Sequence, residues 1–283
     1  MEIKLFFLLS SIVLSIFSLL GSAITICLYN RESKDIINSF SSGSFYGLGL
    51  AFLLAHAFEV FGDDIHYPVA SAVCIITFVI FTLMGLFYEP KDDSPTENSM
   101  KDDLFARIID DGTPSETSRN RFQYPYGDQK TPLMEKAMFL VYLAYNIIEG
   151  MNYATIKLMN KAIPNFLMLV GVKAIEMVSI SQSFLEFRPK KSSFWLWISL
   201  SCLMPPVGTC LTTVYQFQIG KELIGFVYSV ASGAFLYAGC NNWGCILENK
   251  EKWTTSSKVA NFSTFTVAIL IALSLMYIKI SAD

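Results

Sequence analysis

Charge is scarce in this chain. Asp, Glu, Lys and Arg make up 16% of its 283 residues and hydrophobic residues 53%, whereas a soluble domain carries charge on about a quarter of its residues. The mean hydropathy is +0.44. The formal net charge of −3 gives neither nucleic acid nor an anionic surface an electrostatic reason to bind. We therefore expect a chain that lies in a lipid bilayer and has no nucleic-acid partner.

Catalytic motifs are absent from the sequence. It contains no GxSxG, HExxH, phosphate-binding loop or nucleotide-binding fingerprint, so we expect neither an enzyme nor a tightly bound cofactor. Six cysteines are present, but none is in a CxxC arrangement and most lie inside apolar segments. This pattern favours small buried hydrophobic residues over disulfides or a metal cluster.

Long apolar runs, in contrast, are frequent. A helix needs about 20 mainly apolar residues to cross roughly 30 Å of hydrocarbon. A signal peptide is an alternative for the first run, because Lys4 precedes it, but the run is longer than a usual signal core. We predict an all-α integral membrane protein with one transmembrane domain over residues 1–283. Eight transmembrane helices are expected, at about residues 5–29, 41–60, 67–88, 135–158, 163–185, 194–216, 221–246 and 260–281.

One polar segment, residues 89–134, separates the first three runs from the last five. It holds the densest charge of the chain and several Pro and Ser residues, which is typical of a flexible loop. With both termini outside, fifteen of the 21 Lys and Arg residues fall on the inner side, in agreement with the positive-inside rule. We therefore predict a cytoplasmic loop. As a separate expectation, the protein is a multi-pass protein of the plasma membrane rather than of an organelle. A homodimer is one assembly compatible with the sequence.

Two of the apolar runs carry a glutamate near their middle. Asn146 and Glu149 lie three residues apart in the fourth run, as do Lys173 and Glu176 in the fifth, so each pair shares one helical face. A carboxylate in hydrocarbon costs about 2.5 to 3.5 kcal/mol, which makes it a candidate for function. If the two faces meet, their oxygens would replace the hydration shell of a divalent cation. The alternative is an internal ion pair of Lys173 with either glutamate that only holds two helices together.

A second polar group follows the second apolar run. His56 and Glu59 are three residues apart, and Asp63, Asp64 and His66 follow within a short turn. On the outer side of the membrane these groups would attract cations to the mouth of a pathway. Ordinary polarity at the end of a helix explains the same residues without any function.

The motifs YNIIEG, VKAIEM and ASGAFLYAG follow a known arrangement. They resemble segments of the fourth, fifth and seventh helices of the ZIP (Zrt/Irt-like) family of divalent metal transporters. The resemblance implies a ZIP-like bundle, with three helices before a long cytoplasmic loop and five after it. It also implies transport of a divalent metal ion toward the cytoplasm, with zinc as the first candidate and iron or manganese as others.

The resemblance also assigns roles to single residues. Tyr145 and Val172 stand where the family has histidine, and Lys173 implies that a fixed positive charge replaces a second metal ion. The Tyr145 hydroxyl is then an additional candidate ligand. Oxygen ligands suit manganese or magnesium, whereas zinc favours imidazole. Two interpretations follow: a transporter of altered selectivity, or a ZIP-like protein that is a regulatory or structural partner without transport. The positions that carry over as metal ligands are Asn146, Glu149 and Glu176.

Overall fold

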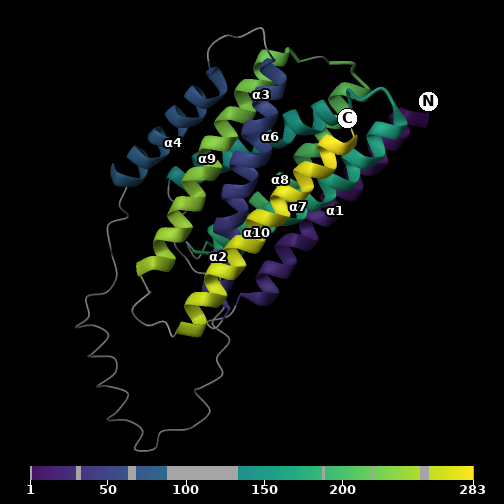
Figure 1. Cartoon of the computed structure of the whole chain (residues 1–283). Coiled ribbons are helices and arrows are strands. Elements are labelled where there is room, and N and C mark those ends of the chain that lie inside the picture. Colours follow the sequence, from purple (N-terminus) through teal and green to yellow (C-terminus); the bar gives the residue numbers. More distant parts are fainter. Residues whose placement is uncertain are drawn as a thin grey trace, which may run out of the picture.

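The described part of the chain is built from helices and contains no strand (Figure 1). The computed structural model describes residues 2–29, 33–62, 68–87, 133–186, 189–217, 219–248 and 255–282. The helices are α1 (Glu2–Leu28), α2 (Lys34–Tyr46), the π-helix η1 (Gly47–Leu54), α3 (Ala55–Phe61), α4 (Val69–Phe87), α6 (Leu133–Tyr153), α7 (Met159–Glu186), α8 (Lys191–Thr213), α9 (Lys221–Glu248) and α10 (Thr255–Ala282).

The helices confirm a multi-pass membrane protein. Within the described ranges, seven helical stretches are long and apolar enough to cross a bilayer. The other predicted span corresponds to α6, which has 21 residues but includes Glu135, Lys136 and Glu149. Figure 1 shows the N and C labels toward the same end of the bundle. The seven stretches are Ile3–Leu28, Lys34–Phe61, Val69–Leu86, Met159–Glu186, Lys191–Thr213, Lys221–Gly244 and Thr255–Tyr277.

Two local features differ from the sequence-based expectation. The helix α6 ends at Tyr153, so the predicted end of this span at residue 158 is wrong. At its other end α6 includes Leu133 and Met134, the last two residues of the predicted loop. The rest of that loop, residues 89–132, lies outside the described ranges. The second span contains η1, whose wider π-helical turns are frequent near functional sites. Hydropathy does not predict such a change of helix type.

The helices pack as two groups. In the first group, α6 packs against α8, and α1 packs against both α7 and α8. In the second group, α2 packs against α9 and α10, and α4 packs against α9. The groups meet where α7 contacts α2 and α10, and where α6 contacts α9. Both helices that carry the central glutamates, α6 and α7, therefore belong to the first group.

The contact between α6 and α8 is a close approach of two backbones. A Cβ atom added at Gly150 would overlap the Pro205 carbonyl oxygen, and one at Gly208 would overlap the Ile147 carbonyl oxygen. The Thr209 hydroxyl donates to the Gly150 carbonyl oxygen at 3.2 Å. Small residues allow such close helix packing in membranes. The turn of α6 that carries Glu149 is thus fixed against α8.

The packing of α1 on α8 compensates for a proline. Pro206 lies inside α8 and has no N–H for the carbonyl group four residues earlier, that of Cys202. The Ser15 hydroxyl of α1 donates to this carbonyl oxygen at 2.6 Å. Because lipid offers no other donor, the bond satisfies a backbone group that would otherwise stay unpaired.

Replacing Ser15 with alanine is therefore expected to lower the free energy of unfolding by about 1 kcal/mol. Denaturation of the purified protein in detergent measures the change. Ser274→Ala is the matched control, because the exposed Ser274 hydroxyl bonds only within its own helix, to the Leu270 carbonyl oxygen at 2.8 Å. Equal losses in both variants would contradict a role for Ser15 between helices.

Candidate functional site

The two central glutamates converge on one lysine. The Lys173 Nζ atom donates to the Asn146 Oδ1 atom at 2.6 Å and to the Glu176 Oε2 atom at 2.7 Å. It also forms an ion pair with the Glu149 Oε2 atom. All four residues are at most 4% exposed. We call Asn146, Glu149, Lys173 and Glu176 the central site.

The spacing of the sequence explains why the two residues of each pair share one helical face. Asn146 and Glu149 are on one face of α6, and Lys173 and Glu176 are on one face of α7, as the i, i+3 pattern predicts. The Asn146 Nδ2 atom donates to the Tyr142 carbonyl oxygen at 2.9 Å, which leaves its Oδ1 atom free to face Lys173. The ion pair expected as the alternative is present, and it involves both carboxylates rather than one.

Two tyrosines complete the surroundings of the lysine. The Tyr145 hydroxyl donates to the Glu149 Oε1 atom at 2.5 Å, so in this structure it supports a carboxylate. The Lys173 Nζ atom lies 4.5 Å from the centre of the Tyr145 ring and 5.8 Å from that of the Tyr142 ring. Sequence reasoning missed Tyr142, although its position four residues before Asn146 places it on the same helical face.

The central site has more acceptor groups than its lysine satisfies. Two carboxylates face one ammonium group, which leaves one formal negative charge when both carboxylates are ionised. Among the described residues, the Glu176 Oε1 atom is buried and has no hydrogen-bond partner. No group of three or more His, Cys, Asp and Glu side chains within the described ranges is placed to hold a metal ion. A metal ion at this site would therefore need Asn146 as a ligand and Lys173 moved aside.

A polar cavity borders Glu149 of the central site. Its volume is about 160 Å³, and its lining includes both Glu149 of the central site and His56 and Glu59 of the predicted outer mouth. The predicted outer mouth and the central site thus border the same cavity, although their residues lie far apart in the chain. The remaining lining residues are Phe52, Asn152, Tyr153, Thr155, Ile156, Asn165, Met168, Leu169 and Tyr228.

His56 has a defined orientation in this polar cavity. Its Nδ1 atom lies 3.0 Å from the Glu59 Oε2 atom, and its Nε2 atom lies 3.0 Å from the Asn152 Nδ2 atom. Both contacts are hydrogen bonds when Nδ1 carries the proton and Nε2 accepts. Both ring nitrogens are thus engaged, which fixes the orientation of the imidazole ring. Predicted mouth residues outside the described ranges are Asp63, Asp64 and His66.

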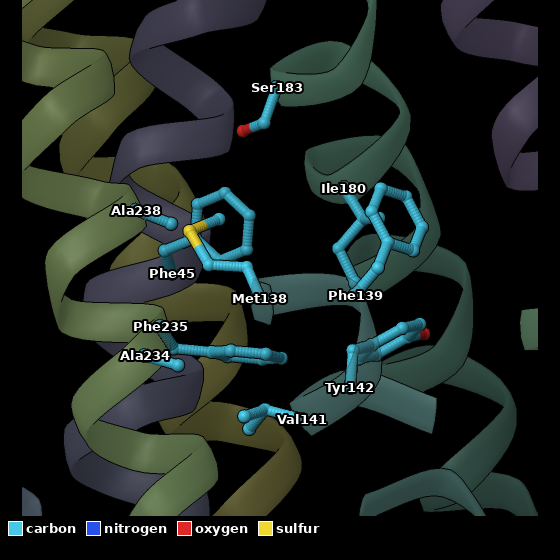
Figure 2. Close-up of a pocket in the computed structure, with 10 residues that line it drawn as sticks. All are labelled: Phe45, Met138, Phe139, Val141, Tyr142, Ile180, Ser183, Ala234, Phe235 and Ala238. Atoms are coloured by element: carbon cyan, nitrogen blue, oxygen red, sulfur yellow. The ribbon is translucent and has the colours of Figure 1, made fainter. Parts of the chain in front are cut away.

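An apolar cavity lies on the other side of Tyr142. Figure 2 shows Phe45 and Phe235 from α2 and α9 opposite Phe139 and Tyr142 from α6. The cavity has a volume of about 30 Å³. Its lining is almost entirely apolar, so it offers a cation few ligands. The two cavities therefore differ in both size and polarity.

Polar contacts join the two helix groups beyond the apolar cavity. Glu186 of α7 accepts a hydrogen bond from Asn38 of α2 at 2.7 Å and pairs with Lys34 at 2.9 Å. Asn242 of α9 donates to Ser183 of α7 at 2.9 Å. Sequence reasoning missed the first contact. The position of Glu186, ten residues after Glu176 on the same helix, was an available signal, whereas nothing in the sequence pointed to Asn38.

No protein-family model matches the chain, and no curated protein matches it.

Proposed function

We propose that this protein is a membrane carrier that moves a divalent metal cation toward the cytoplasm in the manner of the ZIP family. Zinc is the first candidate from the resemblance, and iron or manganese are the others. One observation carries the proposal: a single polar cavity borders His56, Glu59 and Glu149, and so leads from the predicted outer mouth to the central site. A receptor or purely structural protein has no need of such a passage.

The proposed ligands are the three acceptors that now surround Lys173. Asn146 supplies a neutral oxygen, and Glu149 and Glu176 supply compensating negative charge. The Lys173 ammonium group occupies the place of the cation between transport events, because two buried carboxylates without a positive charge are costly. An arriving dication displaces the ammonium group and takes its oxygen partners.

Release toward the cytoplasm requires the two helix groups to move relative to each other. The apolar cavity offers a cation few polar groups, and the bonds of α7 to Asn38 and Asn242 hold the groups together beyond it. Carriers expose a central site alternately to the two sides by such movements. Because all four residues of the central site lie on α6 and α7, the site moves as one unit.

Uptake of metal by cells tests the proposal. Cells that produce the wild type are expected to take up zinc, iron or manganese above background, and a Glu149→Ala/Glu176→Ala variant is expected to return uptake to background. Glu222→Ala is the matched control, since Glu222 is exposed on the first turn of α9. Surface labelling normalises each value to the amount of protein in the membrane. Equal uptake by the wild type and the double variant would contradict the proposal.

A ZIP-like regulatory or structural partner without transport is the second candidate. The occupancy of the central site by Lys173 favours it, because a tethered ammonium group with two hydrogen bonds and an ion pair closes the site to other cations. This candidate predicts no uptake by the wild type above background, with normal amounts of protein in the membrane.

A further inference from the structure

The ammonium group of Lys173 lies among three oxygens, with two hydrogen bonds and one ion pair. It has three N–H groups, and three oxygens surround it: Asn146 Oδ1 at 2.6 Å, Glu176 Oε2 at 2.7 Å and the ion-paired Glu149 Oε2. From this geometry we infer that the central site is a receptor for a primary ammonium group, and that Lys173 is its built-in ligand.

The aromatic surroundings distinguish an ammonium group from a metal ion. The Tyr145 ring centre lies 4.5 Å from Nζ, within the range of a cation–π contact, and the Tyr142 ring lies at 5.8 Å. Aromatic faces attract alkylammonium groups in this way but offer a dication no lone pair. Mn²⁺ or Mg²⁺ takes about six oxygen ligands, whereas the site directs three at its centre. As it stands, the arrangement suits an ammonium group, and a metal ion would need Lys173 moved aside and further ligands added.

The inference makes a prediction about a free ligand. Shortening Lys173 to alanine removes the Cγ, Cδ, Cε and Nζ atoms, and n-propylammonium contains the same three carbons and one nitrogen. The polar cavity borders Glu149, so a small amine has a route to the vacated space. The inference rests on the site named in the proposed function, but not on transport.

Thermal unfolding of the purified Lys173→Ala variant in detergent tests the inference. At equal ionic strength, n-propylammonium chloride is expected to raise its Tm by several degrees over potassium chloride, because a ligand that binds only the folded state stabilises it. Ethylammonium is expected to give a smaller rise. Tetramethylammonium has no N–H donors and is expected to give none. The Tm of the same variant is also measured with MnCl₂ and with ZnCl₂, each against potassium chloride at equal ionic strength.

Two controls locate the effect. The wild type is expected to show no rise with n-propylammonium, since Lys173 already fills the site. A Lys173→Ala/Glu149→Gln/Glu176→Gln variant lacks the charged acceptors and is also expected to show none. A rise of the same size in either control would overturn the inference, because the amine would then act elsewhere on the protein.

The remaining outcomes are equally decisive. A larger rise with Mn²⁺ or Zn²⁺ than with n-propylammonium would overturn the ammonium assignment while favouring a metal site. No rise with any cation would overturn it as well. The Lys173→Ala variant is open to aggregation during purification. In that case it is purified once with n-propylammonium chloride and once with potassium chloride, and the yields of monodisperse protein are compared. Equal yields count against the inference. Failure of metal uptake leaves this result untouched, because the Tm requires no transport.

Discussion

Replacing Lys173 with methionine is expected to lower the free energy of unfolding by about 3 to 5 kcal/mol, the usual cost of removing one partner from a buried ion pair. The methionine fills a similar volume, so the loss comes from charge rather than from a cavity. Glu149 and Glu176 remain behind, each less than 5% exposed, with no positive charge between them. Denaturation of the purified variant in detergent, compared with the wild type, measures the difference.

Neutralising the carboxylates separates this electrostatic effect from a packing effect. A Lys173→Met/Glu149→Gln/Glu176→Gln variant is expected to be more stable than Lys173→Met alone, because no uncompensated charge stays buried. Lys34→Met is the matched control: Lys34 also pairs with a glutamate, but its side chain is 40% exposed, so a change of at most about 1 kcal/mol is expected. A triple variant less stable than Lys173→Met would show that packing, not charge, dominates at this position.

The second large effect is expected at the close approach of α6 and α8. Adding one methyl group with Gly150→Ala forces the new Cβ atom onto the Pro205 carbonyl oxygen, which is backbone and cannot rotate away. We expect the free energy of unfolding to fall by about 3 kcal/mol, at the upper end of overpacking costs. Because Glu149 is the neighbouring residue, we also expect the central site to shift and any metal uptake to decrease.

Gly244→Ala is the matched control for this substitution. It lies in α9, and nothing comes within 4 Å of an added Cβ atom there. Alanine favours a helix over glycine by about 1 kcal/mol, so this variant is expected to equal or exceed the wild type in stability. Thermal unfolding in detergent compares the two. Equal stability of Gly150→Ala and the wild type would mean that the helices separate there without cost.

Much of the central site is predictable from local spacing. The pairs Asn146 with Glu149 and Lys173 with Glu176 repeat at three residues, which fixes a shared helical face whatever the tertiary structure is. The apolar runs likewise predict the spanning helices, and the structure confirms seven stretches of sufficient length and apolarity in the described ranges. The end of α6 at Tyr153 was not predictable, because residues 154–158 are apolar enough to continue the run.

The sequence by itself determined which helices form and which polar residues share a face, because hydrophobic periodicity acts between residues close together in the chain. Only the tertiary structure decided what those faces meet. The partners Lys173 and Asn146 are 27 residues apart, and His56 and Asn152 are 96 apart. Such contacts depend on how far each helix is rotated and how closely backbones approach, as at Gly150. That is why the lysine between the two carboxylates, rather than beside one of them, emerged only from the folded molecule.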